Sequence, residues 1–178
     1  MNFSYSEEQQ LLADSIARFL QKDYTFEIRR GIIRSAEGWS RAVWAQLAEM
    51  GLTGLSIPAE YGGFGDALID ATVAMEAIGA GLVVEPYLAT VVLGGSAVTL
   101  AGSAAQKQAV LPSIVAGKTT LALAYAEAEG RYDPRQVTTR AARSGAGYTL
   151  SGRKTVVAHG GQADQLVIVA RTAGGDRD

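Results

Sequence analysis

Most of the chain carries apolar residues at the three- and four-residue spacing of an α-helix. Residues 6–23 begin with Ser6 as an N-cap and Gln9 three residues later, which together form a capping box, and their apolar side chains lie on one face. Residues 39–52 repeat this pattern behind Ser40. Both segments are therefore predicted to be amphipathic helices.

A loop and further helices follow. Residues 57–66, "IPAEYGGFGD", are too rich in glycine and proline for regular structure, and their glycines could either hold a ligand through main-chain N–H groups or simply turn the chain. Pro86 suits a first helical turn, Ser103 can cap a helix, and Pro112 is predicted to kink or shorten one. The predicted helices are 67–82, 86–102 and 104–118.

After Lys118 the pattern changes to short segments rich in β-branched residues. A domain boundary is predicted near Thr119. The glycine-rich turn at 144–147 suits a hairpin, which favours antiparallel over parallel pairing. The predicted fold class is therefore α+β, with a helical domain at 1–118 and the start of an antiparallel β domain at 119–178. The strand-like segments are 137–142, 148–157 and 165–171.

Composition and charge limit the classes of partner and metal site that the chain can have. Sixteen basic and eighteen acidic residues among 178 give a net charge of −2, which provides no general attraction for nucleic acid or anionic lipid. Without cysteine and with one histidine, the chain has no disulfide and no ordinary structural zinc site, and no metal site is predicted. The N-terminal residues lack the features of a signal peptide, and no apolar window is long enough to span a bilayer, so the predicted location is cytoplasmic.

Isolated motifs are weak evidence for catalysis. Gly117-Lys118-Thr119 matches the end of a phosphate-binding loop, but Pro112 replaces the glycine that such a loop needs. Gly145-x-Gly147 is better explained as a turn than as a dinucleotide fingerprint.

Three titratable side chains are weak candidates for catalysis. His159 stands beside two glycines with no nucleophile at motif spacing, which favours a turn residue over a general base. Glu127 and Glu129 could form a carboxylate pair, but solvated loop charges are the expectation.

Longer stretches resemble the acyl-CoA dehydrogenases over the whole chain. They are "FSYSEEQQLLADSIARFL", "WAQLAEMGLTGLSIPAEYGGFG", "AYAEAEGRYD" and, most specifically, "LSGRKTVVAHGGQADQLVIVAR" at residues 150–171. "EPYLATVVLGGSAVTLAGS" is most similar to the branch of pimeloyl-CoA dehydrogenase small subunits. That branch implies a dicarboxylic or bulky acyl group, whose carboxylate would need an Arg or Lys partner, and the sequence singles out none.

The resemblance implies a helical domain, then a β-barrel or sandwich, then C-terminal helices, with FAD between the last two. It implies α,β-dehydrogenation of an acyl-CoA, in which a glutamate removes the α proton and the flavin takes the hydride. It also implies electron-transfer flavoprotein as the electron acceptor and a homo- or hetero-oligomer. Because the chain ends inside the expected β domain, the catalytic glutamate is expected in an absent region. Glu76, Glu85 and Glu127 are not candidates for that role.

The resemblance also assigns site residues. Ala126 and Ala158 stand where the family has threonines that contact the flavin. Val156 stands at a position that is often tryptophan in the family, and Tyr132 stands where the family has a serine beside the substrate. Main-chain groups near Tyr125, Ala126 and Val157 could replace the lost hydroxyls, each of which contributes about 0.5–1.5 kcal/mol. Two readings follow: an active dehydrogenase, or a non-catalytic partner subunit with a degraded flavin site. The cofactor-binding residues expected from the resemblance are Leu123, Tyr125, Ala126, Val156, Val157 and Ala158.

Overall fold

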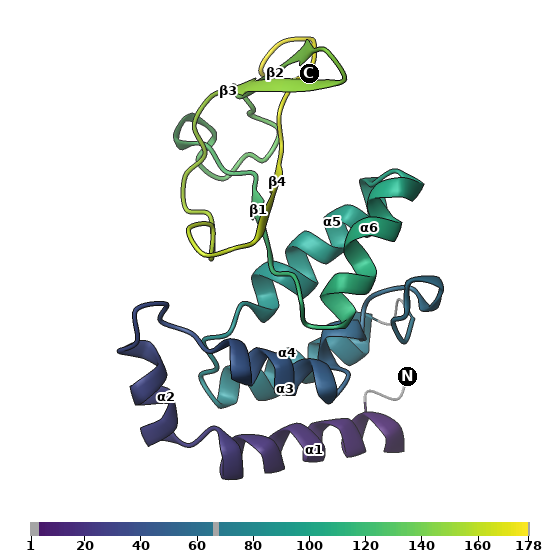
Figure 1. Ribbon diagram of the computed structural model, residues 1–178, viewed down its shortest axis with the longest axis vertical. Helices are drawn as coiled ribbons and strands as arrows, with labels where there is room; N and C mark the ends of the chain where they lie inside the picture. Colours follow the sequence, from purple (N-terminus) through teal and green to yellow (C-terminus); the bar gives the residue numbers. More distant parts are fainter. Residues whose placement is uncertain (1–3, 66–67, 178) are drawn as a thin grey trace.

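The computed structural model describes residues 4–65 and 68–177, with the helices in the N-terminal part and the strands in the C-terminal part (Figure 1). The predicted α+β class is confirmed in this order of elements. Residues 66 and 67, at the junction of the predicted loop and helix, lie outside the described residues. The helical elements are α1 (Glu7–Asp23), α2 (Phe26–Ile33), α3 (Arg41–Glu49), η1 (Leu52–Gly54), η2 (Ala59–Tyr61), α4 (Leu68–Ala80), η3 (Leu88–Gly95), α5 (Ser96–Ala101), α6 (Ala104–Val115) and η4 (Ala128–Gly130).

The predicted helix caps are confirmed. The Gln9 amide donates to the Ser6 hydroxyl over 3.2 Å, and the Ser6 amide donates to the Gln9 side chain over 3.0 Å. Ser103 caps α6 in the same way, and Ser40 caps α3. These side chains satisfy N–H groups that a helix start leaves unpaired, so they fix where each helix begins.

The helices differ from the predictions in two places. The predicted shortening at Pro112 is wrong, because α6 includes Pro112 and continues to Val115, whereas the alternative of a kink stays a prediction. Helix α2 was not predicted, although Thr25 caps it by accepting from the Ile28 amide and its apolar residues lie at helical spacing.

The glycine-rich loop turns the chain. The amides of Gly63, Phe64 and Gly65 donate to carbonyls of the preceding turns, so these N–H groups are already used. A Cβ added at Gly63 would lie 1.9 Å from the Ile57 carbonyl oxygen. Glycine is therefore required here for close packing of the backbone.

One apolar core joins the helices and reaches the first strand. Helix α1 packs on α4, and β1 packs on the π-helical segment η3. The Thr90 hydroxyl bonds both the amide and the carbonyl of Leu121 over 3.1 Å, and a Cβ at Gly94 would lie 2.5 Å from the Leu121 Cβ. Close contact between β1 and η3 thus fixes the position of the first strand against the helices. The largest fully buried side chains include Trp44, Tyr87, Ile16, Leu47, Leu52, Ile57, Leu111, Ile114 and Leu121.

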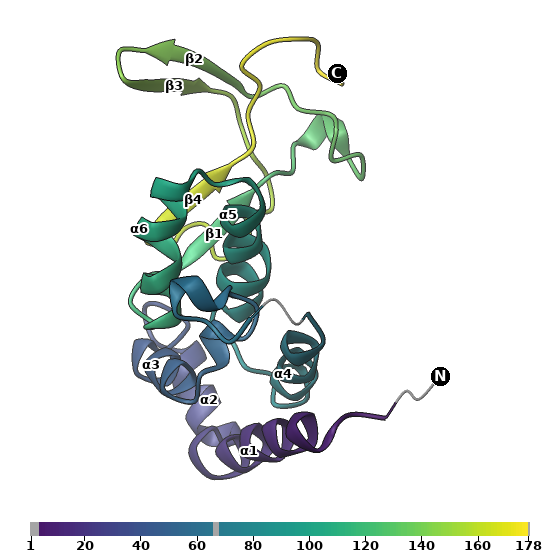
Figure 2. The same cartoon turned by 90° about the vertical axis from the view of Figure 1, so that its right-hand side faces the viewer.

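The four strands form two pairs, β1 (Leu121–Ala124) with β4 (Gln165–Ile168) and β2 (Arg140–Ser144) with β3 (Gly147–Ser151). The antiparallel hairpin is confirmed, and it stands at the far end of the molecule from α1 (Figure 2). The first pair is parallel, which corrects the antiparallel expectation. Parallel pairing is possible because residues 125–164 provide a crossover long enough to return the chain to the start of β1.

The predicted strand at 148–157 was too long. Strand β3 ends at Ser151, since Gly152 has a φ of 153° and Val156 has a φ of 51°, neither of which continues a strand. Residues 152–158 therefore form an irregular segment, and this segment lies at the candidate site.

Candidate functional site

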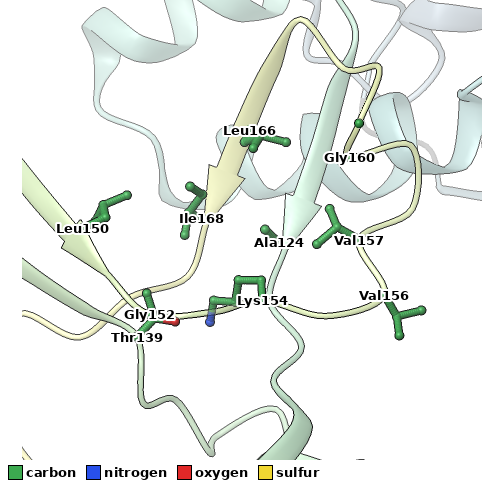
Figure 3. Close-up of a pocket in the computed structure, with 11 residues that line it drawn as sticks. Ala124, Thr139, Leu150, Gly152, Lys154, Val156, Val157, Gly160, Leu166 and Ile168 are labelled. Carbon is green, nitrogen blue, oxygen red and sulfur yellow. The ribbon is translucent and has the colours of Figure 1, made fainter.

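The irregular segment 152–158 lies against the end of β1, as the close-up in Figure 3 shows for the residues around Ala124. The Thr155 amide donates to the Ala126 carbonyl over 2.9 Å, and Lys154 Nζ donates to the Tyr125 carbonyl over 3.2 Å. These bonds bring together the two stretches, 125–126 and 156–158, that the sequence assigned to one site.

A buried carboxylate network holds this junction. Both carboxylate oxygens of Glu127 accept hydrogen bonds from Thr138 and Thr139, with the amides at 2.7 and 3.0 Å and the Thr139 hydroxyl at 2.6 Å. The Thr138 hydroxyl also donates to Glu127, and Lys154 Nζ lies 2.7 Å from its Oε1. The Glu127 side chain is 0 % exposed and that of Lys154 is 8 % exposed. The expectation of solvated loop charges is therefore wrong for Glu127, because five donors stabilise its charge inside the protein.

The network sets the ionisation of Glu127. Burial alone raises the pKa of this carboxyl, but the bonds from Lys154, Thr138 and Thr139 outweigh burial and hold the pKa well below its usual range. A carboxyl with a lowered folded-state pKa stabilises the protein above the pKa of the unfolded chain, near 4.3. This stability is lost as the pH falls toward the folded-state pKa.

The pH dependence gives a first prediction for Glu127→Gln. We expect the difference in unfolding free energy between wild type and this variant to shrink by about 1–2 kcal/mol between pH 7 and pH 3. Urea denaturation at both pH values measures it. A constant difference would contradict the assigned charge state of Glu127.

Two other charged residues of the 150–171 stretch, Asp164 and Arg171, also form hydrogen bonds with main-chain groups. Asp164 accepts from the amide and hydroxyl of Thr120 over 2.8 Å and pairs with Arg41 over 3.2 Å, which links β1 to α3. Arg171 donates to the carbonyls of Arg135 and Val137. Lys154, Asp164 and Arg171 thus each hold a different part of the irregular β region.

The predicted site residues lie on three separate hollows. Val156 and Val157 line a cavity of about 450 Å³ together with Lys154, whereas Ala158 opens onto a second pocket of about 540 Å³. Tyr125, Ala126 and the fully exposed Tyr132 line a third of about 280 Å³. Leu123 lies within β1, opposite Val167, and lines none of the described hollows. Residues 125–126 and 156–158, called the ridge below, thus lie between these hollows.

Main-chain donors on this ridge are available to a cofactor. Within the described residues the structure gives no hydrogen bond to the N–H groups of Ala126, Val157 or Ala158. The carbonyls of Tyr125, Ala126 and Val157 already accept bonds from Lys154, Thr155 and Gly160. Each of these N–H groups could donate to a flavin acceptor such as a pyrimidine carbonyl oxygen, but the three residues border different hollows, Ala126 the third, Val157 the first and Ala158 the second.

No pattern in the sequence predicts the unusual backbone of this ridge. Val156 has a φ of 51° and a side chain that is 94 % exposed, and His159 has a φ of 55°. A positive φ costs a β-branched residue about 1–2 kcal/mol, and such outliers cluster at binding and active sites. The Val156 outlier therefore supports a functional role for the segment, and only backbone coordinates could have revealed it.

Comparison with known proteins gives the family. A sequence profile of the acyl-CoA dehydrogenase N-terminal domain matches residues 6–118. The chain belongs to the acyl-CoA dehydrogenase family. Acyl-CoA dehydrogenases are FAD-binding flavoproteins.

Individual relatives agree with this assignment. Mitochondrial isovaleryl-CoA dehydrogenase of Pongo abelii is 33 % identical over 94 % of this chain and 40 % of its own length. A solved structure of the ChsE4–ChsE5 complex from Mycobacterium tuberculosis matches with a TM-score of 0.84 and 28 % identity, covering 96 % of this chain and 45 % of the other. A structure described as electron transferring flavoprotein of Acidaminococcus fermentans matches with a TM-score of 0.83 and 29 % identity, covering 97 % and 46 %. The chain thus spans less than half the length of these proteins.

Proposed function

We propose that the protein is a FAD-dependent acyl-CoA dehydrogenase that removes hydrogen from the α and β carbons of an acyl-CoA thioester. Besides family membership, the observation that supports this proposal is a ridge fixed by a buried ion pair, on which the described structure gives no hydrogen bond to the N–H groups of Ala126, Val157 and Ala158. Bound FAD supplies the hydride acceptor. The chain's own contribution is to orient the flavin edge through those donors and to shield it from water.

Further parts of the proposal follow the family. The base that removes the α proton would be a glutamate outside these 178 residues. We propose electron-transfer flavoprotein as the electron acceptor, consistent with the Acidaminococcus neighbour, and we propose that the protein forms an oligomer in the cytoplasm.

The strands would begin a β-barrel or sandwich, with the domain boundary near Thr119. Tyr132 would lie beside the substrate, and its complete exposure leaves it accessible for that contact. No helix in the described part of the chain is long and apolar enough to cross a membrane.

A second candidate function has its own support. Neither Ala126 nor Ala158 offers a hydroxyl, and the exposed Val156 covers less area than an aromatic ring would. These features favour a non-catalytic or half-site partner subunit of a heteromeric dehydrogenase. The likeness to a ChsE4–ChsE5 complex is consistent with that arrangement.

FAD affinity tests the proposal. We expect the full-length protein to bind FAD, measured by quenching of flavin fluorescence, and Ala126→Thr and Ala158→Thr each to tighten binding about 2- to 10-fold. Each threonine would add one hydroxyl donor to the ridge. Ala146→Thr, in the exposed hairpin turn, is the matched control and should leave the affinity unchanged. Failure of wild type and both variants to bind FAD would overturn the proposal and favour the partner subunit.

A further inference from the structure

The chain leaves the ridge through a turn at residues 157–163, called the ridge turn below. The hydrogen-bonded amides of this turn donate to carbonyls of the same turn. In the part of the chain that the structure describes, residues 156–161 form no hydrogen bond with any segment outside it. Ridge residues 156–158 are therefore held from two sides, by the Thr155 amide before them and by the end of the ridge turn after them.

The end of the ridge turn is attached to the loop before α3 and to the residue before β1. The Gln162 side-chain amide donates to the Glu37 carbonyl. Asp164 uses both carboxylate oxygens: Oδ2 accepts from the amide and the hydroxyl of Thr120 over 2.8 Å, and Oδ1 lies 3.2 Å from Arg41 Nη2. The turn is thus anchored to the strands through Thr120 and to the helical part through Glu37 and Arg41.

Arg41 is oriented for this contact by its own neighbours. Its guanidinium carbon lies 5.0 Å from the centre of the Trp39 ring, and Trp39 is 3 % exposed, so the ring is fixed in the core. A cation held over an aromatic face has fewer directions open to it. The Arg41 side chain is 53 % exposed and that of Asp164 is 35 % exposed, so the pair contributes little to overall stability. Such a weak pair can still bias the position of a local segment.

We propose that Arg41 is a positioning residue for the ridge: by pairing with Asp164, it holds the ridge turn against the helical part and so sets where the main-chain groups of Val157 and Ala158 lie. The inference rests on the proposed function, because it names a residue that places the FAD-binding ridge. Without Arg41, the turn keeps its internal hydrogen bonds and its Thr120 anchor, but it loses one of its contacts with the helical part. A looser ridge must be ordered when FAD binds, which lowers the affinity.

Hydrogen exchange in the full-length protein tests the first step. For Arg41→Met we expect the hydrogen-bonded amides of the ridge turn to exchange roughly 2- to 5-fold faster, with unchanged protection in α1 and α4. Arg41→Lys should be intermediate, because it keeps the charge and loses the planar group that stacks on Trp39. Arg34→Met is the matched control, since Arg34 is exposed at the end of α2 and forms no ion pair with any residue that the structure describes.

FAD affinity, measured by quenching of flavin fluorescence, tests the second step. Arg41→Met should weaken FAD binding roughly 2- to 5-fold, and Arg41→Lys should recover part of the loss. Asp164→Asn keeps an acceptor for Thr120 and removes the charge that faces Arg41, so it should cause a similar loss. The double variant Arg41→Met/Asp164→Asn should then bind FAD no more weakly than either single variant, because both remove the same contact.

The outcomes separate this inference from the proposed function. Unchanged exchange in the ridge turn of Arg41→Met overturns the inference, and so does faster exchange throughout the helical part, which would show a general structural role. Faster exchange in the turn with unchanged FAD affinity also overturns it, because the turn would then not place the groups that meet the flavin. A wild-type protein that binds no FAD overturns the proposed function, and the exchange rates alone then decide whether Arg41 fixes the turn.

Discussion

Replacing Lys154 with methionine is expected to lower the free energy of unfolding by about 3–5 kcal/mol, because it leaves the buried Glu127 carboxylate without its cation. Lys154 Nζ lies 2.7 Å from Glu127 and also holds the Tyr125 carbonyl, so the variant loosens the end of β1 and segment 152–158 together. Urea denaturation at pH 7 measures the loss. Bound FAD should be lost in parallel, since the ridge donors depend on this junction.

Two controls separate charge burial from the loss of packing. Lys118 is exposed at the end of the helical part, and Lys118→Met should change the stability by no more than about 0.5 kcal/mol. The double variant Lys154→Met/Glu127→Leu should be less destabilised than Lys154→Met alone, because it removes the orphaned charge. A Lys154→Met protein as stable as wild type would show that the ion pair does not hold the site.

Replacing Gly152 with alanine is expected to cost about 3 kcal/mol or more, from steric overlap together with an unfavourable φ. The added Cβ would lie 2.5 Å from the Thr139 hydroxyl and 2.6 Å from its Cα, at a φ of 153°. Since Thr139 donates both its amide and its hydroxyl to Glu127, its displacement would break two of the five bonds to that carboxylate.

Gly161→Ala is the matched control for Gly152. Both glycines line the same cavity, but a Cβ at Gly161 meets nothing within 4 Å. Thermal unfolding should therefore show a clear fall in Tm for Gly152→Ala and little change for Gly161→Ala. Equal effects of the two substitutions would contradict the close packing of Gly152 on Thr139.

The helices could be predicted because their signals are local. Ser6, Ser40 and Ser103 each mark a helix start through bonds to amides three residues away, and the apolar spacing gives the buried face. Helix α2 carries the same kind of local signal, since Thr25 caps it through the Ile28 amide, and it could have been predicted in the same way. Helix α6 continues through Pro112 to Val115. The parallel pairing of β1 with β4 joins residues more than forty apart in sequence, which no local pattern reports.

The site could be predicted only in part. The Thr155 to Ala126 hydrogen bond shows that the two stretches named from the resemblance, 125–126 and 156–158, are adjacent, while their role in binding FAD stays a prediction. Burial of Glu127 was missed because its partners, at positions 138, 139 and 154, come from separate segments. Whether a charged residue is solvated depends on such distant neighbours. Sequence alone therefore predicts exposure, which is the more common state of charged residues.

The most direct test of the account is the visible absorption spectrum of the full-length protein, purified without added cofactor and then mixed anaerobically with an acyl-CoA. The account predicts an oxidised-flavin spectrum that bleaches on addition of the thioester, because the ridge donors hold a flavin that accepts the substrate's hydride. A folded protein that remains colourless even with excess FAD would contradict it.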